Sequence, residues 1–84
     1  MKVYLITQNE QNGYDTYDSA VVCAENEEEA RGIHPGPWVE NGEPWPQYYY
    51  RTWASNPDVV VVKYLGEAIE GMEKGVVVAS FNAG

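Results

Sequence analysis

Two residues of this chain could combine into a nucleophile and a base. Cys23 is the only cysteine and His34 the only histidine, so a cysteine–histidine dyad would have to join them. Cys23 lies inside the apolar stretch 19–24, whereas His34 follows a short helical pattern, where a protonated imidazole would complement the helix end. We therefore expect no dyad and a buried Cys23 in a reducing compartment. One residue of each kind also excludes a tetrahedral zinc site of Cys and His.

Oxygen-bearing side chains crowd the stretch around Gly13, which raises the question of a calcium loop. With Gly13 as the sixth position of an EF-hand loop, Gln8 stands first and Ser19 twelfth, where aspartate and a bidentate glutamate are required. Asp15 and Asp18 are therefore expected to cap a loop rather than to hold an ion. The chain has neither a Walker A sequence nor a glycine-rich dinucleotide motif. We expect no catalytic residue, no metal site and no cofactor.

Acidic residues dominate the charge of the chain. Thirteen Asp and Glu stand against five Lys and Arg, a net charge of -8. This charge repels nucleic acids and anionic membranes but attracts a basic protein surface, and it can mimic phosphates toward a protein that holds nucleic acid. The alternative is that it only keeps a small protein soluble. If the first loop folds near the helix start, the acidic patch comprises Asp15, Asp18, Glu25, Glu27, Glu28 and Glu29.

Six aromatic side chains lie close together in the middle of the chain. Tryptophan and tyrosine are common hot-spot residues of interfaces, and their rings also stack on flat ligands such as nucleobases. The alternative is that a domain this small uses these rings as a lid over its core. The predicted partner-binding or ligand-binding aromatic set comprises Trp38, Trp45, Tyr48, Tyr49, Tyr50 and Trp53.

The elements that must position these residues are mainly strands. Residues 2–7 and 19–24 have strand composition, and the second strand is expected to return antiparallel beside the first. Residues 59–65 include four consecutive valines, which predicts a central strand covered on both faces. Residues 76–81 form the last strand, after a polar link with a helical turn near its start. The sequence thus predicts an α+β domain with a small, mostly antiparallel sheet of four or five strands.

One short helix is predicted on one face of that sheet. Asn26 is a suitable N-cap, and Glu29 three residues later completes a capping-box pattern. The helix ends near Gly32, before the prolines. Residues 34–47 carry all but one of the prolines and are predicted to form a Pro/Trp-rich surface loop, which would have to cover the other face of the sheet. Residues 48–53 fit either a short strand or a helical turn.

The length of 84 residues predicts a single domain over 1–84. The start of the chain lacks a charged segment followed by a long apolar run, and no apolar run is long enough to cross a bilayer. We therefore expect a cytoplasmic protein without direct membrane contact.

Both ends of the chain resemble small proteins encoded by tailed bacteriophages and prophages. The similar stretches are 3–8 and 12–22 near the start, and 64–68 and 79–84 near the end. The proline-rich middle is unmatched, and no activity or site residues come with the resemblance. It implies a phage context, and so the cytoplasm of an infected bacterial cell. Small acidic phage proteins are often inhibitors of host nucleic-acid-handling or immune machinery, including anti-CRISPR proteins.

The function expected from these features is binding, not catalysis. The leading hypothesis is a phage accessory protein that inhibits a host defence or nucleic-acid-binding protein with a basic surface by stoichiometric contact. The first alternative is a binder of a nucleotide-like signal that uses the aromatic loop. The second is a structural or self-assembling phage protein, and a homo-oligomer is therefore left open.

Overall fold

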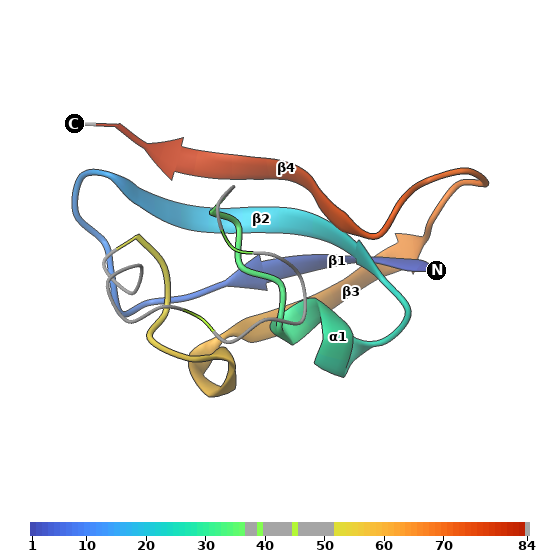
Figure 1. The fold of residues 1–84 in the computed structure, drawn as a ribbon, viewed down its shortest axis with the longest axis horizontal. Helices are drawn as coiled ribbons and strands as arrows, with labels where there is room; N and C mark the ends of the chain where they lie inside the picture. Colours follow the sequence, from blue (N-terminus) through green and yellow to red (C-terminus); the bar gives the residue numbers. More distant parts are fainter. Residues whose placement is uncertain (37–38, 40–44, 46–51, 84) are drawn as a thin grey trace.

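Four antiparallel strands form one sheet in the order β3-β1-β2-β4 (Figure 1). The computed structural model describes residues 1–36, 39, 45 and 52–83. A single α-helix, α1 (Glu27–Arg31), and a 3-10 turn, η2 (Pro57–Val59), are the helical elements of these residues. The predicted α+β class, with its antiparallel sheet and short helix, is confirmed. The strands are β1 (Lys2–Thr7), β2 (Thr16–Ala24), β3 (Val61–Glu67) and β4 (Gly75–Asn82).

The predicted first strand is confirmed, and β2 returns antiparallel beside it as expected. The second strand, however, is longer than the sequence indicated, since it begins at Thr16 and not at Ser19. The buried amide of Gln8 orders the loop between the strands, because it donates to the carbonyl oxygens of Gln11 (2.7 Å) and Tyr17 (3.2 Å). This anchor lets pairing start three residues earlier than local composition suggests.

The valine-rich strand is an edge strand, so the prediction of a central, doubly covered strand was wrong. β3 pairs only with β1, and β4 forms the opposite edge beside β2. Val61 is 63% exposed. A run of valines shows only that apolar side chains point to both faces of the strand. It does not show that another segment of the chain covers either face.

Local capping explains why α1 begins where it does. The Asn26 carboxamide accepts from the Glu29 N–H at 2.8 Å, and the Glu29 carboxylate accepts in turn from the Glu25 N–H at 2.9 Å. The predicted helix and its cap are confirmed. In the polar link between β3 and β4 a helical turn was expected at 67–72; the structure instead continues β3 to Glu67 and then forms a turn closed by the Met72 N–H to Ile69 carbonyl bond (3.2 Å). No helix of the described residues is both long and apolar enough to cross a membrane.

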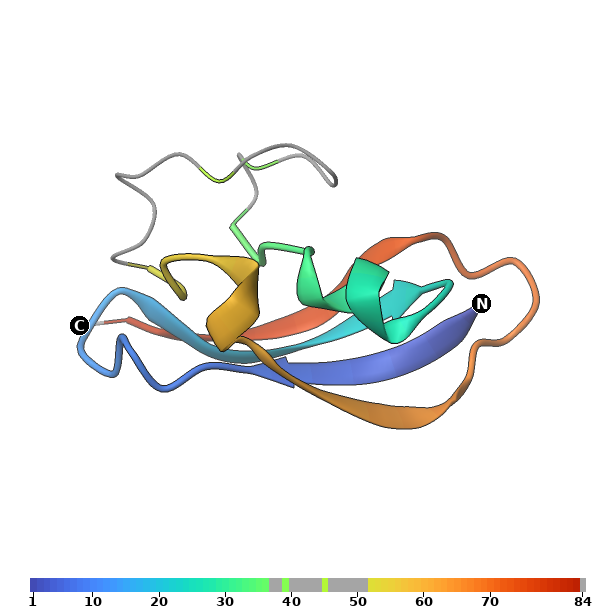
Figure 2. The same ribbon diagram turned by 90° about the horizontal axis from the view of Figure 1, so that it is seen from below.

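The core lies between one face of the sheet and the segments that carry α1 and η2 (Figure 2). Successive side chains of a strand point to opposite faces, so every second side chain points into this core. Ile33, Trp53 and Ala54 pack on these side chains from the side of α1. Arg31 ties the helix to the start of β3 by donating to the carbonyl of Val60. The sheet contributes Tyr4, Ile6, Ala20, Val22 and Ala24.

No described segment covers the other face of the sheet, which we call the open face (Figure 2). The predicted cover by the aromatic loop is wrong for the part of that loop that the structure describes. Trp45 and Trp53 pack with the core cluster, on the same side of the sheet as α1. The described residues therefore form two layers, which are the sheet and the segments that carry α1 and η2 on one of its faces.

Candidate binding surfaces and pocket

The six predicted acidic residues fall into two groups at opposite ends of β2. Asp15 and Asp18 lie at its beginning, and the four glutamates follow its end at α1. Six residues of β2 lie between Asp18 and Glu25, and the seven steps from one to the other correspond to about 23 Å. The first loop therefore does not bring Asp15 and Asp18 to the helix, and the expected convergence into one patch does not occur.

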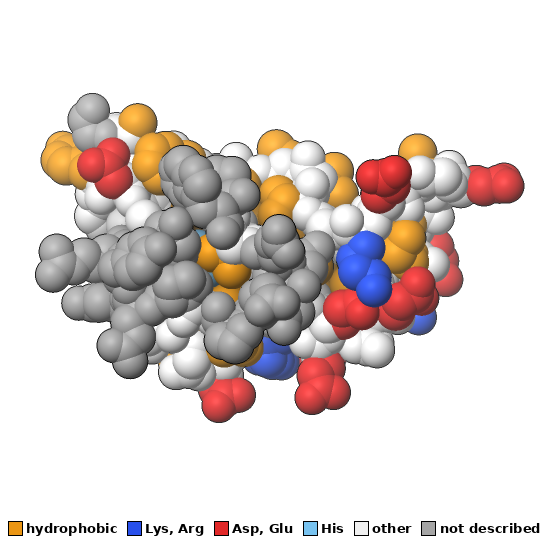
Figure 3. Space-filling view, in the orientation of Figure 1, with side chains coloured by type: hydrophobic (Ala, Val, Ile, Leu, Met, Phe, Trp, Pro, Cys, Tyr) orange, Lys and Arg blue, Asp and Glu red, His pale blue; other side chains and the backbone are white. Residues whose placement is uncertain are grey.

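Basic side chains lie among the glutamates at α1 (Figure 3). Arg31 contacts the Glu27 carboxylate at 2.9 Å, and Lys74 contacts the Glu29 carboxylate at 3.0 Å. The side chains of Glu25 and Glu28 are exposed and make no hydrogen bond or ion pair within the described part of the chain. These two carboxylates are the ones that a basic partner can reach without displacing an internal cation.

Glu29 has a structural role at the start of α1. The hydrogen bond from the Glu25 N–H, helped by the Lys74 ammonium, holds the pKa of the Glu29 carboxyl below its ordinary value of 4.5, while partial burial opposes the shift. The carboxylate is thus stabilised in its charged form by the fold. It fixes the chain entering the helix, and it is not freely available to a partner.

The predicted aromatic set serves the core in its described part. Trp53 is fully buried, so its assignment as a partner-binding or ligand-binding residue was wrong. Trp45 donates its indole N–H to the Gly32 carbonyl at 3.3 Å, and the His34 ring meets it edge-on with centroids 5.1 Å apart. These rings secure the end of α1. Trp38, Tyr48, Tyr49 and Tyr50 lie outside the described residues.

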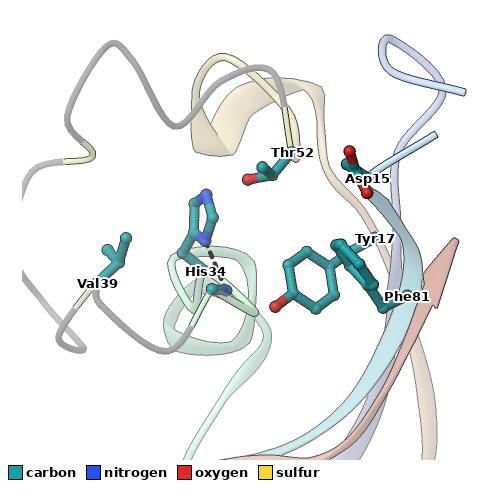
Figure 4. A pocket seen from close by; sticks show the side chains of 7 residues that line it. Asp15, Tyr17, His34, Val39, Thr52 and Phe81 are labelled. Atoms are coloured by element: carbon teal, nitrogen blue, oxygen red, sulfur yellow. Dashed lines mark hydrogen bonds between the residues drawn. The ribbon is translucent and has the colours of Figure 1, made fainter. Parts of the chain in front are cut away.

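An apolar pocket of about 310 Å³ lies on the covered side of the sheet, where β2 begins and β4 ends (Figure 4). Tyr17 and Phe81 are cross-strand partners, and their ring centroids are 4.8 Å apart at 58°. Figure 4 shows the Tyr17 ring reaching from β2 toward the segment that carries His34, with Phe81 beside it. The described lining comprises Asp15, Tyr17, His34, Gly36, Val39, Thr52 and Phe81.

Close packing fixes the wall of the pocket that His34 forms. His34 is 3% exposed, and its Nδ1 accepts from the Gly36 N–H at 2.8 Å. In this bond Nδ1 is the acceptor, which differs from the expected role of His34 as a protonated cap of the helix. A Cβ atom at position 36 would lie 2.9 Å from both Cε1 and Nδ1 of the imidazole. Glycine is what permits the backbone to approach the ring.

A hydrogen-bonded turn positions Asp15 at the rim of the pocket. Its φ of 60° lies in the left-handed region, which aspartate and asparagine tolerate better than most residues. The Asp15 N–H donates to the Asn82 carbonyl at 2.6 Å, and the Asn82 amide donates to the Gly13 carbonyl at 3.0 Å. Tyr17 continues this frame by donating its N–H to the Thr52 carbonyl at 2.7 Å. Several segments thus hold the rim in place.

The open face carries one apolar row at its centre. The strand registers align Leu5 with Val21, and Val21 with Val78, in one row across the sheet. Lys63, opposite Leu5, ends this row and is the one ionisable side chain that the described registers place in the two central rows. The next row comprises Val61, Thr7, Ser19 and Ser80.

Metal chemistry has no support in the described residues, among which no three His, Cys, Asp or Glu gather as ligands. The pocket and the open face were both missed by the sequence analysis. Tyr17 and Phe81 are sixty-four positions apart and meet only through the β2–β4 register. Apolar residues at successive positions of β1 and β4 place apolar side chains on both faces of the sheet, but this pattern does not reveal which face is uncovered.

Comparison of the chain with protein-family models, with curated proteins and with solved structures gave no significant match.

Proposed function

We propose that this protein acts by stoichiometric binding, without catalysis, and inhibits a host defence or nucleic-acid-binding protein in the cytoplasm of a phage-infected bacterium. The observation that carries the binding mode is the open face of the sheet. The partner has a basic surface. The phage setting is supported by the resemblance of both chain ends to small proteins of tailed phages.

The shape of the open face favours a protein as the ligand. Small-molecule sites are concave, whereas a flat apolar sheet face is matched by another protein surface. Leu5 and Val21 at the centre of the sheet lie in one row with Val78, which is 58% exposed, and Val61, which is 63% exposed, lies in the next row opposite Thr7. Interfaces have such an apolar centre, depleted of charge, inside a polar rim.

The size of this face favours a contact in which charged neighbours also take part. Four strands spaced by about 4.8 Å, each about six residues long, present roughly 400 Å². A stable interface buries about 800 Å² on each partner. The contact must therefore extend past the sheet edges to polar side chains. The net charge of -8 accelerates encounter with a basic partner and makes the association rate sensitive to salt.

The direct test measures anti-defence activity in cells and binding in lysate with the same variants. Phage plating is measured on hosts with active defence systems that express the protein. In parallel, the tagged protein captures host proteins at low and high salt, followed by mass spectrometry. Inhibition predicts higher plating efficiency and a basic host protein in stoichiometric amount, released at high salt.

Substitutions separate the open face from general surface effects. Val61→Lys with Val78→Lys places two charges on the face, and we expect plating and capture to fall at least about tenfold. Tyr14→Lys with Ile69→Lys is the matched control, because both side chains are about three-quarters exposed and lie outside the sheet. Equal losses in both double variants, or no captured protein in any host tested, would overturn the proposal.

Charge substitutions test the role of the acidic residues. Glu25→Gln with Glu28→Gln removes the two unpaired carboxylates at α1 and leaves the Glu27 and Glu29 ion pairs intact. Slower association with little change in dissociation is the expected result. The same substitutions can be combined with Asp15→Lys and with the open-face pair Val61→Lys and Val78→Lys. Capture of the host protein by this combined variant would contradict a charge-guided contact.

Self-assembly is the competing use of the same face. A second copy would bury two open faces against each other, as in a β-sandwich. Light scattering during size-exclusion chromatography distinguishes the two cases. A concentration-independent dimer that Val61→Lys with Val78→Lys dissociates would assign the face to self-association instead of a host partner.

A further inference from the structure

The pocket beside Tyr17 is independent of the open face, because the two lie on opposite sides of the sheet. Its volume of about 310 Å³ is at the lower end of the range for small-molecule sites. Its walls come from the start of β2, the end of β4, the segment after α1 and Thr52. The hydrogen bonds of its rim and the tight contact between His34 and Gly36 hold these walls in position before any ligand arrives.

The chemistry of the lining restricts the kind of molecule that fits. Tyr17 and Phe81 present aromatic rings, and Val39 adds an aliphatic surface. Aromatic faces attract cations as well as other rings. Asp15 is the one carboxylate of the described lining, and that lining includes neither Lys nor Arg. An anionic group would meet this carboxylate and the field of a protein with a net charge of -8.

We propose that this pocket binds a small organic cation with an aromatic body. The ring packs against Tyr17 and Phe81, and the amine lies at the rim beside the Asp15 carboxylate. A phosphate-bearing nucleotide does not match this lining, and the ligand therefore differs from the nucleotide-like signal that the sequence suggested.

Three indole compounds that differ mainly in the charge of the side chain test this assignment. Tryptamine is a cation, tryptophol is neutral and indole-3-acetate is an anion. Each is titrated to roughly millimolar concentration, the affinity range of ligands this small, while the resonances of Tyr17, Phe81 and Gly36 are followed by NMR. We expect saturable shifts, with tryptamine binding most tightly and indole-3-acetate most weakly.

Asp15→Asn is the decisive variant, since asparagine also tolerates the left-handed backbone and only the charge is lost. Tryptamine affinity should fall about three- to fivefold, the range of an exposed ion pair, and tryptophol affinity should not change. Asp18→Asn is the matched control, because it alters net charge equally and does not line the pocket. Phe81→Leu should weaken all three compounds.

Several outcomes would overturn the assignment. They are the absence of saturable shifts at the pocket, equal affinities of the three compounds, and equal effects of Asp15→Asn and Asp18→Asn. The titration needs no host protein, so its failure leaves the proposed inhibition standing. A protein that binds tryptamine as expected but has no effect on plating contradicts only the proposed function.

Discussion

At the scale of single residues, the side chains that matter most are those that shape the pocket wall. His34 is one of three buried polar residues of the described chain. Its position depends on a neighbour without a side chain, since the ring occupies the space that a Cβ atom at position 36 would need. The chemistry of this site is therefore set by a glycine as much as by the functional groups around it.

Gly36→Ala tests this dependence. The added methyl group meets two imidazole atoms at 2.9 Å, so the buried ring or the backbone must move. We expect a loss of about 1–3 kcal/mol in the free energy of unfolding, typical of overpacking. Urea denaturation measures it.

Gly13→Ala is the control for this variant. An added Cβ at position 13 meets nothing within 4 Å. Its effect should stay within about 0.5 kcal/mol. Equal stabilities of the two alanine variants would show that the His34 ring is not held against the backbone.

At the scale of elements, α1 is too short to be stable alone, because an isolated helix of five residues lacks enough internal hydrogen bonds. It is held by its cap, by Arg31 contacting Val60 and by the ion pair between Glu29 and Lys74. This ion pair links the helix start to the connection before β4, forty-five residues away. The helix thus depends on contacts that are distant in sequence.

The pH dependence of stability reports on this link. The folded-state pKa of Glu29 lies below its ordinary value of 4.5, so its charged form stabilises the fold. This contribution is present above pH 4.5 and is lost as the pH falls through the lowered pKa. We expect wild type to exceed Glu29→Gln in stability by about 1 kcal/mol or less at neutral pH and low salt, with the difference vanishing in acid.

Thermal unfolding across pH 2–7 measures this difference. Glu28→Gln is the control, because the Glu28 side chain is exposed and forms no ion pair within the described residues. The thermal stability of Glu28→Gln should vary with pH in the same way as that of wild type. A difference between wild type and Glu29→Gln that persists undiminished at the acidic end would contradict the assigned role of the carboxylate.

At the scale of the whole molecule, charge and exposed apolar surface oppose each other. The open face favours contact with other apolar surfaces, whereas the net charge of -8 keeps copies of the chain apart at neutral pH. Repulsion disappears near the isoelectric point of about 4.3. Charge and exposed apolar surface thus have opposite effects on self-association.

Light scattering as the pH approaches 4.3 tests this balance. We expect wild type to associate there, and Val61→Thr with Val78→Thr to associate several-fold less, because the change removes apolar surface without altering charge. Ile69→Thr is the control, since this side chain is 74% exposed and lies in the connection between β3 and β4. Association unaffected by the open-face change would show that the face is not the contact.

The sequence by itself determined the local structure of this protein. Strand composition predicted β1, and the pattern of Asn26 and Glu29 predicted the start of α1, because strand propensity and helix capping depend on residues only a few positions apart. The antiparallel sheet with one short helix followed from the order of these elements. The acidic character was also visible at this level.

Tertiary structure alone decided which surfaces exist. Whether the valines of β3 lie at an edge or at the centre depends on which strands pair, and pairing is set by contacts between distant segments. The length of β2 separates Asp18 from Glu25, and the register between β2 and β4 brings Tyr17 to Phe81. A pocket and an uncovered face are properties of the packed layers, and no short stretch of sequence encodes them.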